Sequence, residues 1–226
     1  MRSVLLSTLL LGCTASAAES DPENFADVHH FASANAALKP DAARVVFMGD
    51  SITASWQDES FFADNPHFVN RGISGQTAQQ MLLRFRRDVI ELHPAVVHIM
   101  AGTNDVAENA GPERDADIEG AIASMVELAL AHHIGVIVAS IPPAKDFPWH
   151  RGLDPAPRII RLNAWIRSYA AKTRVTYVDY WPVLATADGE MKPGVSQDGV
   201  HPNAEGYRLM QSLAQAAIDR ALGKKD

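Results

Sequence analysis

The sequence predicts an α/β protein, a three-layer α/β/α sandwich built around a parallel β-sheet. Five short apolar segments of strand length alternate along the chain with segments in which apolar residues recur at helical spacing. Such alternation predicts βαβ units, and their right-handed crossovers place helices on both faces of the sheet. Polar residues suited to chemistry follow several of the apolar segments, which is where open α/β sheets hold their sites.

The first apolar segment, residues 44–48, ends at Gly49 and predicts a buried strand. Residues 68–70 predict a second, weaker strand. Residues 77–92 then carry apolar side chains at helical spacing, with Thr77 suited to cap the start of the helix and a proline beyond its end.

The remaining elements repeat this alternation. Three further apolar runs are expected to be strands, at residues 95–100, 135–139 and 174–178. Helical spacing predicts helices at residues 112–132, 157–171 and 203–222. No internal repeat, low-complexity run or linker interrupts the pattern, so residues 19–226 are expected to form one domain.

The composition is typical of a globular protein and excludes several classes of function. Of the 226 residues, 47% are hydrophobic and 21% are charged. The 27 acidic and 20 basic side chains give a net charge of −7. That balance argues against nucleic acid as a partner and, more weakly, against an anionic membrane surface. The single cysteine excludes an internal disulfide and a multi-cysteine metal site.

The histidines do not have the spacing of a metal site. The pairs His29–His30 and His132–His133 are adjacent in sequence, so the two side chains of each pair diverge. The zinc motif H-E-x-x-H is absent from the sequence. We therefore expect no metal and no cofactor.

Residues 1–18 have the character of an export signal. An apolar run at residues 4–11 is too short for a bilayer, which needs about 20 residues, and Ala15-Ser16-Ala17 resembles a signal-peptidase cleavage site. Residues 10–13 also resemble a bacterial lipobox, in which Cys13 would carry a lipid anchor. These alternatives exclude each other. Both predict an exported protein, either periplasmic or secreted, or an outer-membrane lipoprotein held to the membrane only through Cys13.

Gly49-Asp50-Ser51 lies at a turn from a strand to a helix. Gly49 allows a tight backbone there, and the turn would present the Ser51 hydroxyl at the edge of the sheet. A serine in this position is a candidate nucleophile once a base removes its proton, and the amides after the turn suit a developing oxyanion. The alternative is that Asp50 or Ser51 only caps the next helix.

Asp198-Gly-Val-His201 supplies a candidate base and its carboxylate. An imidazole would accept the serine proton, and an acid three residues away could fix the tautomer of the ring. The alternative is a helix-capping loop with a surface histidine.

Two further groups could donate hydrogen bonds to an oxyanion. The side chain of Asn104 follows the third strand, and the amide of Gly72 follows the second. Ordinary turn chemistry is the alternative for both, since Gly and Asn are common turn residues.

Taken together, the four motifs resemble the four sequence blocks of the SGNH (GDSL) hydrolases, in family order and across residues 45–222. The resemblance implies five parallel strands in the order 2-1-3-4-5 and a serine esterase without a cofactor. It also implies roles for the residues of the motifs: Ser51 as nucleophile, His201 as base, Asp198 as its partner, and Ser51, Gly72 and Asn104 as oxyanion donors.

The particular motif variants resemble the platelet-activating-factor-acetylhydrolase-like and carbohydrate-esterase branches of that family. This implies a small-molecule or carbohydrate ester as substrate, with a short acyl group, above all acetyl. A lipase, a lysophospholipase or an aryl esterase is the alternative within the enzyme class, and a non-catalytic carbohydrate-binding module is the alternative outside it. Expected substrate contacts are Trp56, Trp149 and His150, the last two in a loop at residues 142–157 that is expected to overhang the site. A proline-stiffened surface loop is the alternative for that segment.

Overall fold

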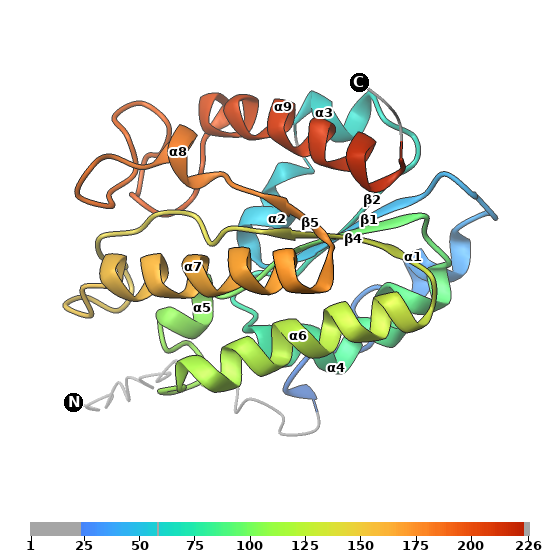
Figure 1. Cartoon of the computed structure of the whole chain (residues 1–226), viewed down its shortest axis with the longest axis horizontal. Helices are drawn as coiled ribbons and strands as arrows, with labels where there is room; N and C mark the ends of the chain where they lie inside the picture. The colour runs from blue at the N-terminus through green and yellow to red at the C-terminus, as the bar shows by residue number, and fades with distance from the viewer. Residues whose placement is uncertain (1–23, 58, 224–226) are drawn as a thin grey trace, which may run out of the picture.

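The computed structural model describes residues 24–57 and 59–223, which form one five-stranded parallel sheet between two layers of helices (Figure 1). The strand order is β2-β1-β3-β4-β5. The α/β sandwich and the order 2-1-3-4-5 are both confirmed. The strands are β1 Val45–Gly49, β2 Phe68–Gly72, β3 Val96–Met100, β4 Gly135–Ala139 and β5 Thr176–Val178.

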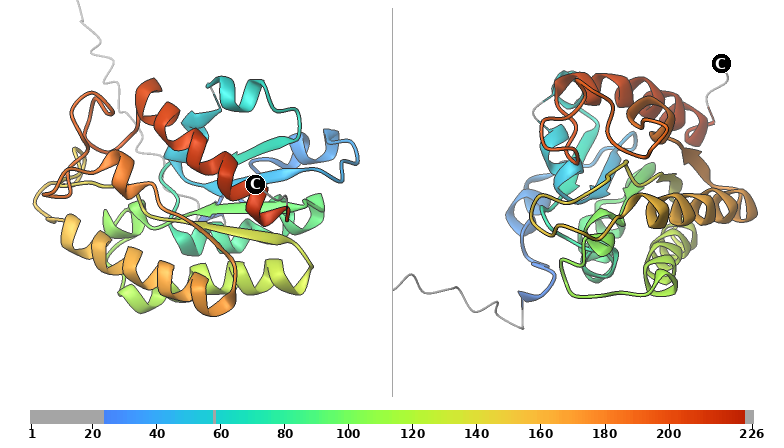
Figure 2. Two further views of the ribbon diagram at one scale, coloured as in Figure 1. Left: turned by 45° about the horizontal axis from the view of Figure 1, so that its top comes forward. Right: turned by 90° about the vertical axis from the view of Figure 1, so that its left-hand side faces the viewer.

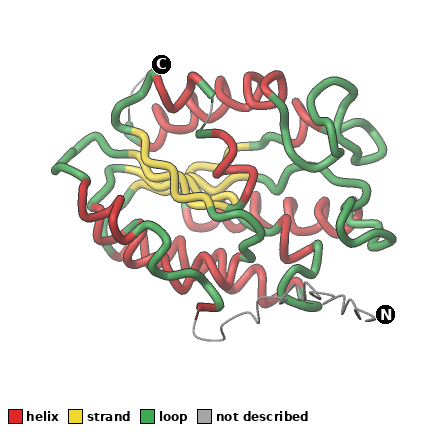
Figure 3. The backbone as a smooth tube through the Cα atoms, turned by 180° about the vertical axis from the view of Figure 1, so that it is seen from behind, coloured by secondary structure: helices red, strands yellow, loops and turns green. Residues whose placement is uncertain are grey.

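The long helices divide between the two faces of the sheet (Figures 1 and 3). One face is covered by α4 Ala78–Asp88, α6 Asp115–Ala131 and α7 Ala156–Thr173. The other is covered by α9 Ala204–Ala221 together with the short helices α2 Ser51–Trp56 and α3 Ser60–Ala63. Three more α-helices of the described residues are short: α1 Ala32–Ala37, α5 Thr103–Val106 and α8 Trp181–Leu184.

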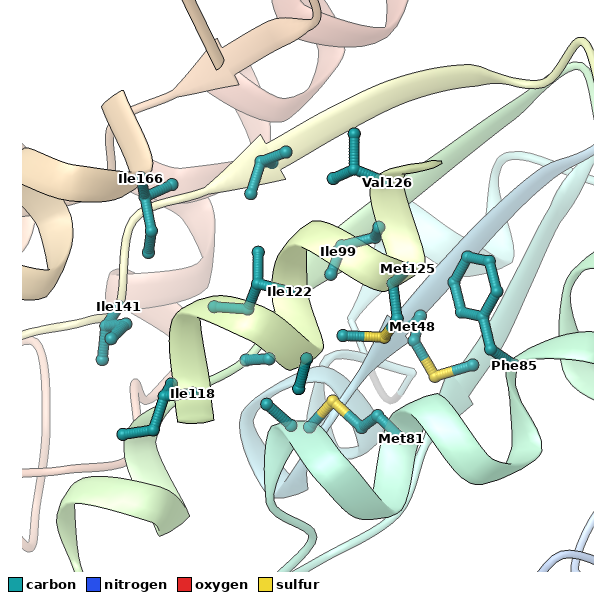
Figure 4. Close-up of a cluster of buried hydrophobic side chains, with 14 of the residues drawn as sticks. Met48, Met81, Phe85, Ile99, Ile118, Ile122, Met125, Val126, Ile141 and Ile166 are labelled. Atoms are coloured by element: carbon teal, nitrogen blue, oxygen red, sulfur yellow. The ribbon is translucent and has the colours of Figure 1, made fainter. Parts of the chain in front are cut away.

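Side chains of each strand alternate between two hydrophobic clusters, because successive residues of a strand point to opposite faces. In β1, Val46 and Met48 pack toward α4 and α6, where Figure 4 shows Met48 beside Met81 and Met125. Phe47 instead packs toward α2 and α9. Both faces of the sheet are therefore buried, which explains why its strands are continuously apolar in sequence.

The helix predicted at residues 77–92 is shorter than its apolar pattern. It runs from Ala78 to Asp88, and a 3₁₀ turn, η2 Ile90–Leu92, follows it. Val89 leaves the helical conformation, with φ −131° and ψ −65°. The apolar side chains at 89, 90 and 92 are still buried. The apolar pattern therefore predicted the buried positions correctly, although the backbone there is no longer α-helical.

The carboxyl ends of three strands meet at one place. Gly49 of β1 is in register with Gly72 of β2 and with Met100 of β3, so the loops after these strands begin side by side. The right-hand view of Figure 2 looks onto this edge, where α5 and α8 follow β3 and β5.

Among residues 24–57 and 59–223, no helix is long and apolar enough to cross a membrane. The predicted export signal and the lipobox cysteine lie outside these described residues.

Candidate active site

The structure brings together Ser51, His201 and Asp198, although 150 residues separate the first two in sequence. The Ser51 hydroxyl lies 2.8 Å from Nε2 of His201, and Nδ1 of the same ring lies 2.6 Å from Oδ2 of Asp198. A hydroxyl, an imidazole and a carboxylate linked in this order are the arrangement that activates a serine as a nucleophile.

Ser51 is the first residue of α2, and Asp50 caps that helix. Oδ1 of Asp50 accepts a hydrogen bond from the Ile52 amide at 2.9 Å, so the capping alternative is correct for Asp50 and leaves the Ser51 hydroxyl available. Gly49 is required by space, because a Cβ there would lie 2.0 Å from Oγ1 of Thr53.

Asp198 and His201 are held by their own loop before α9. Oδ1 of Asp198 accepts hydrogen bonds from the amides of Val200 and His201, at 3.0 and 2.8 Å. The Asn203 side chain then caps α9 by accepting from the Gly206 amide. Partial burial raises the pKa of Asp198, but hydrogen bonds from the ring and amide of His201 outweigh it and lower that pKa to about 2. The carboxylate is therefore charged at neutral pH and faces Nδ1 of the His201 ring.

Asn104 lies in α5, directly after β3, and is buried against the motif that carries the serine. Its Nδ2 donates to the Gln76 carbonyl at 3.1 Å and to Oδ2 of Asp50 at 3.3 Å. Its Oδ1 accepts a hydrogen bond from Nδ2 of Asn109 at 2.6 Å. The amide group of Asn104 is therefore held in one orientation beside the serine turn.

Gly72 is placed differently from its predicted role. Its amide already donates to Oδ1 of Asn70 at 2.8 Å, and it is buried at the end of β2. A Cβ on Gly72 would lie 2.2 Å from the Ala54 amide nitrogen, so the glycine allows β2 and α2 to pack closely. Its structural role is close packing, and its amide is engaged within the protein.

Gly75, three residues further on, was missed by the sequence reasoning. It lies at an exposed turn with φ +79°, and none of the hydrogen bonds among the described residues uses its amide. Gln76, the next residue, is the one whose carbonyl accepts from Asn104. The signal available in sequence was a glycine in a short turn between a strand and a helix cap.

Trp56 does not reach the site, which corrects its prediction as a substrate contact. Its side chain is 0% exposed and stacks on Phe61 and Tyr207 with ring centroids 5.3 and 5.5 Å away. α2 presents this face to the core beneath α9, because its short amphipathic pattern must bury Ile52 and Trp56 together.

Trp149 does reach the site. Its ring is 45% exposed and lies 5.9 Å from the His201 ring, centroid to centroid. Its Nε1 donates to Oδ1 of Asn109 at 2.9 Å. Nδ1 of the neighbouring His150 lies 2.9 Å from the Ala107 carbonyl. This loop is therefore bound to the segment after α5, with one aromatic face open to solvent beside His201.

In the part of the chain that the structure describes, no group of three or more His, Cys, Asp or Glu side chains is arranged to hold a metal ion.

The buried carboxylates near Ser51 accept hydrogen bonds from backbone amides. Burial raises the pKa of Asp50 to about 6, in spite of the hydrogen bond from the Ile52 amide.

Comparisons with known proteins show the family to which the chain belongs. Residues 47–209 match the model of the GDSL-like lipase/acylhydrolase family, and this chain belongs to that family. A crystal structure of a GDSL-like lipase from Bacteroides thetaiotaomicron is 45% identical, with a TM-score of 0.85, and the match covers 87% of this chain and 99% of that one. The protein is therefore a carboxylic ester hydrolase.

Two weaker similarities to known proteins were also found. The acetylxylan esterase Axe2 from Geobacillus stearothermophilus has a TM-score of 0.62 and 21% identity over 83% of this chain and 98% of its own, which shows a shared fold. A lipoprotein of Bacillus subtilis, YqeF, is 46% identical over 43 residues, which are 19% of this chain and 18% of that protein.

Proposed function

We propose that the protein is a serine esterase in which Ser51 forms an acyl-enzyme. The observation that carries the proposal is the continuous chain of hydrogen bonds from the Ser51 hydroxyl through His201 to Asp198. Ser51 is 150 residues from His201 in sequence, so the contact between them is not explained by local structure.

In the first half of the reaction, Oγ of Ser51 attacks the ester carbonyl carbon while Nε2 of His201 takes the hydroxyl proton. His201 then returns that proton to the alcohol oxygen as the carbon–oxygen bond to the alcohol breaks. In the second half, a water gives its proton to His201 and attacks the acyl group, and Ser51 regains a proton as the acid leaves. Asp198 keeps the ring in the tautomer that leaves Nε2 free to accept.

The oxyanion would be held by the Ser51 amide and by Nδ2 of Asn104. For this, Asn104 exchanges its bond to Asp50, the longer of its two at 3.3 Å, for one to the substrate oxygen. We infer that a third donor comes from the Gly75 amide rather than from Gly72, whose amide is engaged by Asn70. Loss of one such donor costs about 10²–10³ in rate.

For the substrate, we propose a short acyl group, above all acetyl, on a sugar or another polyol. The exposed face of Trp149 beside His201 supports this, because an aromatic face suits a sugar ring at the alcohol side of the ester. The fold shared with an acetylxylan esterase is consistent with it. A lipase or an aryl esterase is the alternative, since the same ring suits an aryl alcohol.

The nucleophile is tested by labelling with a fluorophosphonate probe, followed by mass spectrometry of the labelled peptide. We expect the label on Ser51 and none on the Ser51→Ala variant. Ser55→Ala, an exposed serine on the same short helix, is the matched control and should label as the parent does. A label on any other residue, or activity above a few per cent in Ser51→Ala, would remove Ser51 from the mechanism.

The substrate is tested with nitrophenyl acetate, butyrate, octanoate and palmitate, together with acetate release from acetylated xylan. We expect kcat/KM to be highest for acetate and acetate to be released from the polysaccharide. A preference that rises to eight carbons or beyond, without acetate release, would favour the lipase.

We also propose export, with residues 1–18 removed as a signal and residues 19–226 as the mature domain. The short match to a lipoprotein is consistent with export and leaves the Cys13 lipid as the alternative. The mass of the mature N-terminus, measured from cells that express the full chain, distinguishes cleavage after Ala17 or Ala18 from a lipidated Cys13.

A further inference from the structure

We propose that Asn109 is a positioning residue, which fixes the side-chain amide of Asn104 in the orientation that an oxyanion donor needs, and that Trp149 in turn fixes Asn109. The inference rests on the proposed function, in which Asn104 is such a donor. Neither Asn109 nor its contact with Trp149 belongs to the motifs from which that function was argued.

The orientation of the side-chain amides of Asn109 and Asn104 follows from Trp149. An indole N–H can only donate, so the group of Asn109 that faces Nε1 of Trp149 at 2.9 Å must be its carbonyl oxygen. The NH₂ group of Asn109 therefore faces Asn104 and donates to Oδ1 at 2.6 Å. That bond leaves Nδ2 of Asn104 as the group pointing toward Gln76 and Asp50.

The reverse orientation of Asn104 is opposed on both sides. Its NH₂ group would then meet the NH₂ group of Asn109, two donors facing each other. Its oxygen would meet the Gln76 carbonyl and the Asp50 carboxylate, which are both acceptors. Asn109 thus prevents the amide from turning its oxygen toward the place where negative charge develops, and a preorganised donor is what stabilises an oxyanion.

Asn109 is exposed, but a backbone hydrogen bond holds it in place. Its amide donates to the Asn104 carbonyl at 3.0 Å, which closes the turn after α5. On the other side, Trp149 is anchored in a loop whose His150 binds the Ala107 carbonyl. A substrate group resting on the open face of Trp149 is therefore two hydrogen bonds away from the proposed oxyanion donor.

The test is a double-mutant cycle on nitrophenyl acetate with Asn109→Ala and Asn104→Ala. We expect Asn109→Ala to lower kcat about tenfold with KM changed less than twofold, because only the transition state uses the donor. In the Asn104→Ala background, the same substitution should have no further effect on kcat. A residue that only supports the fold would lower kcat equally in both backgrounds, and that result would overturn the inference.

Trp149→Phe provides a second arm, since it keeps an aromatic ring and removes only the indole N–H. We expect kcat to fall about threefold, an effect that should disappear in the Asn109→Ala background. Trp165→Phe, a half-buried tryptophan on α7 that stacks on Tyr169, is the matched control and should leave kcat unchanged. If Asn104→Ala is fully active, the oxyanion assignment and this inference both fail; if only Asn109→Ala is fully active, this inference fails alone.

Discussion

The two halves of the candidate site are held in different ways. On the serine side, Asp50 and Asn104 are 1% and 3% exposed and are bound by groups from several elements. On the base side, the side chains of Asp198 and His201 are 40% and 32% exposed, and Asp198 is bound by residues of its own loop. The serine side is thus part of the folded core, whereas the base side is a loop at the edge of the sheet that is held by hydrogen bonds of its own.

Arg84 shows how far the serine side reaches into the core. This arginine of α4 is 0% exposed, and its Nη2 donates to the carbonyls of Gly49 and Arg71, at the ends of β1 and β2. Its Nη1 pairs with Asp88 at 3.0 Å, and its Nε donates to the side chain of Gln76. The turn that carries the serine is therefore joined to α4 through one buried charge.

This difference predicts that substitutions will separate activity from stability. On the base side they should remove activity and leave the free energy of unfolding unchanged. On the serine side, substitutions of residues away from the reacting atoms should mainly lower the free energy of unfolding.

The largest effect is expected on the base side, for His201→Ala. With no base, kcat should fall by about 10⁴-fold or more, because the serine proton has no acceptor. The midpoint of thermal unfolding should stay within about 2 °C of the parent, since the ring is partly exposed and bonds only Ser51 and Asp198. Steady-state kinetics and calorimetry on one preparation check both halves, with the exposed His133→Ala as control.

Asp198→Ala should be milder, by about 10- to 100-fold in kcat relative to His201→Ala. Without the carboxylate, Nε2 of His201 can still accept the serine proton, but the ring loses the group that holds its tautomer and stabilises its protonated form. If this variant were the most damaged of the triad, the assignment of His201 as the base would be wrong. A measurement of kcat for Ser51→Ala, His201→Ala and Asp198→Ala under one set of conditions gives the ranking directly.

On the serine side, Arg84→Met should lower the free energy of unfolding by about 3–5 kcal/mol, because it leaves the buried Asp88 carboxylate without its cation. Urea unfolding followed by circular dichroism measures this. Arg86→Met, at an exposed position of the same helix, should change stability by less than about 0.5 kcal/mol. A loss below about 1 kcal/mol for Arg84→Met would contradict the role given to this side of the site.

The comparison also explains what could be predicted from sequence. The strands, the long helices and the positions of Ser51, Asp198 and His201 were predictable, because apolar periodicity and short motifs are local in sequence. The prediction of Trp56 as a substrate contact was wrong because tertiary packing decides which side of α2 is buried. One side of this helix bears Ser51, and the other is buried under α9.

Other features of the site could not be predicted from the sequence. Gly72 and Gly75 are glycines of one short segment, and the sequence does not show that the Gly72 amide donates to Asn70, two residues away. The roles of Arg84 and Asn109 depend on partners brought in by other elements, such as Gly49 and Trp149. Partners across the fold of this kind leave no periodic signal in the sequence.

The smallest effect is expected from Asp105→Asn, which tests whether the buried side also sets the pH dependence of stability. Burial raises the pKa of Asp105 above its ordinary value of 3.8, and the charge of Glu113 adds to it, against the hydrogen bond from the Ala78 amide. The folded state therefore holds this proton more tightly than the unfolded chain does. From about pH 4 toward neutrality the folded state binds more protons, so its stability falls as the pH rises.

An asparagine at position 105 keeps an oxygen for the Ala78 amide and has no proton to lose. We expect the free energy of unfolding of Asp105→Asn to vary less between pH 5.5 and 8.5. Relative to the parent it should rise by about 2 kcal/mol over that range, because each pH unit below the folded pKa of about 7 contributes about 1.4 kcal/mol. Asp117→Asn is the control, because Arg114 lowers the pKa of Asp117 and its titration lies below this range. Urea unfolding at three pH values measures both variants. A pH slope as steep as the parent's in Asp105→Asn would show that its charge is already compensated in the folded state, and the buried side would then differ from the base side in packing but not in charge.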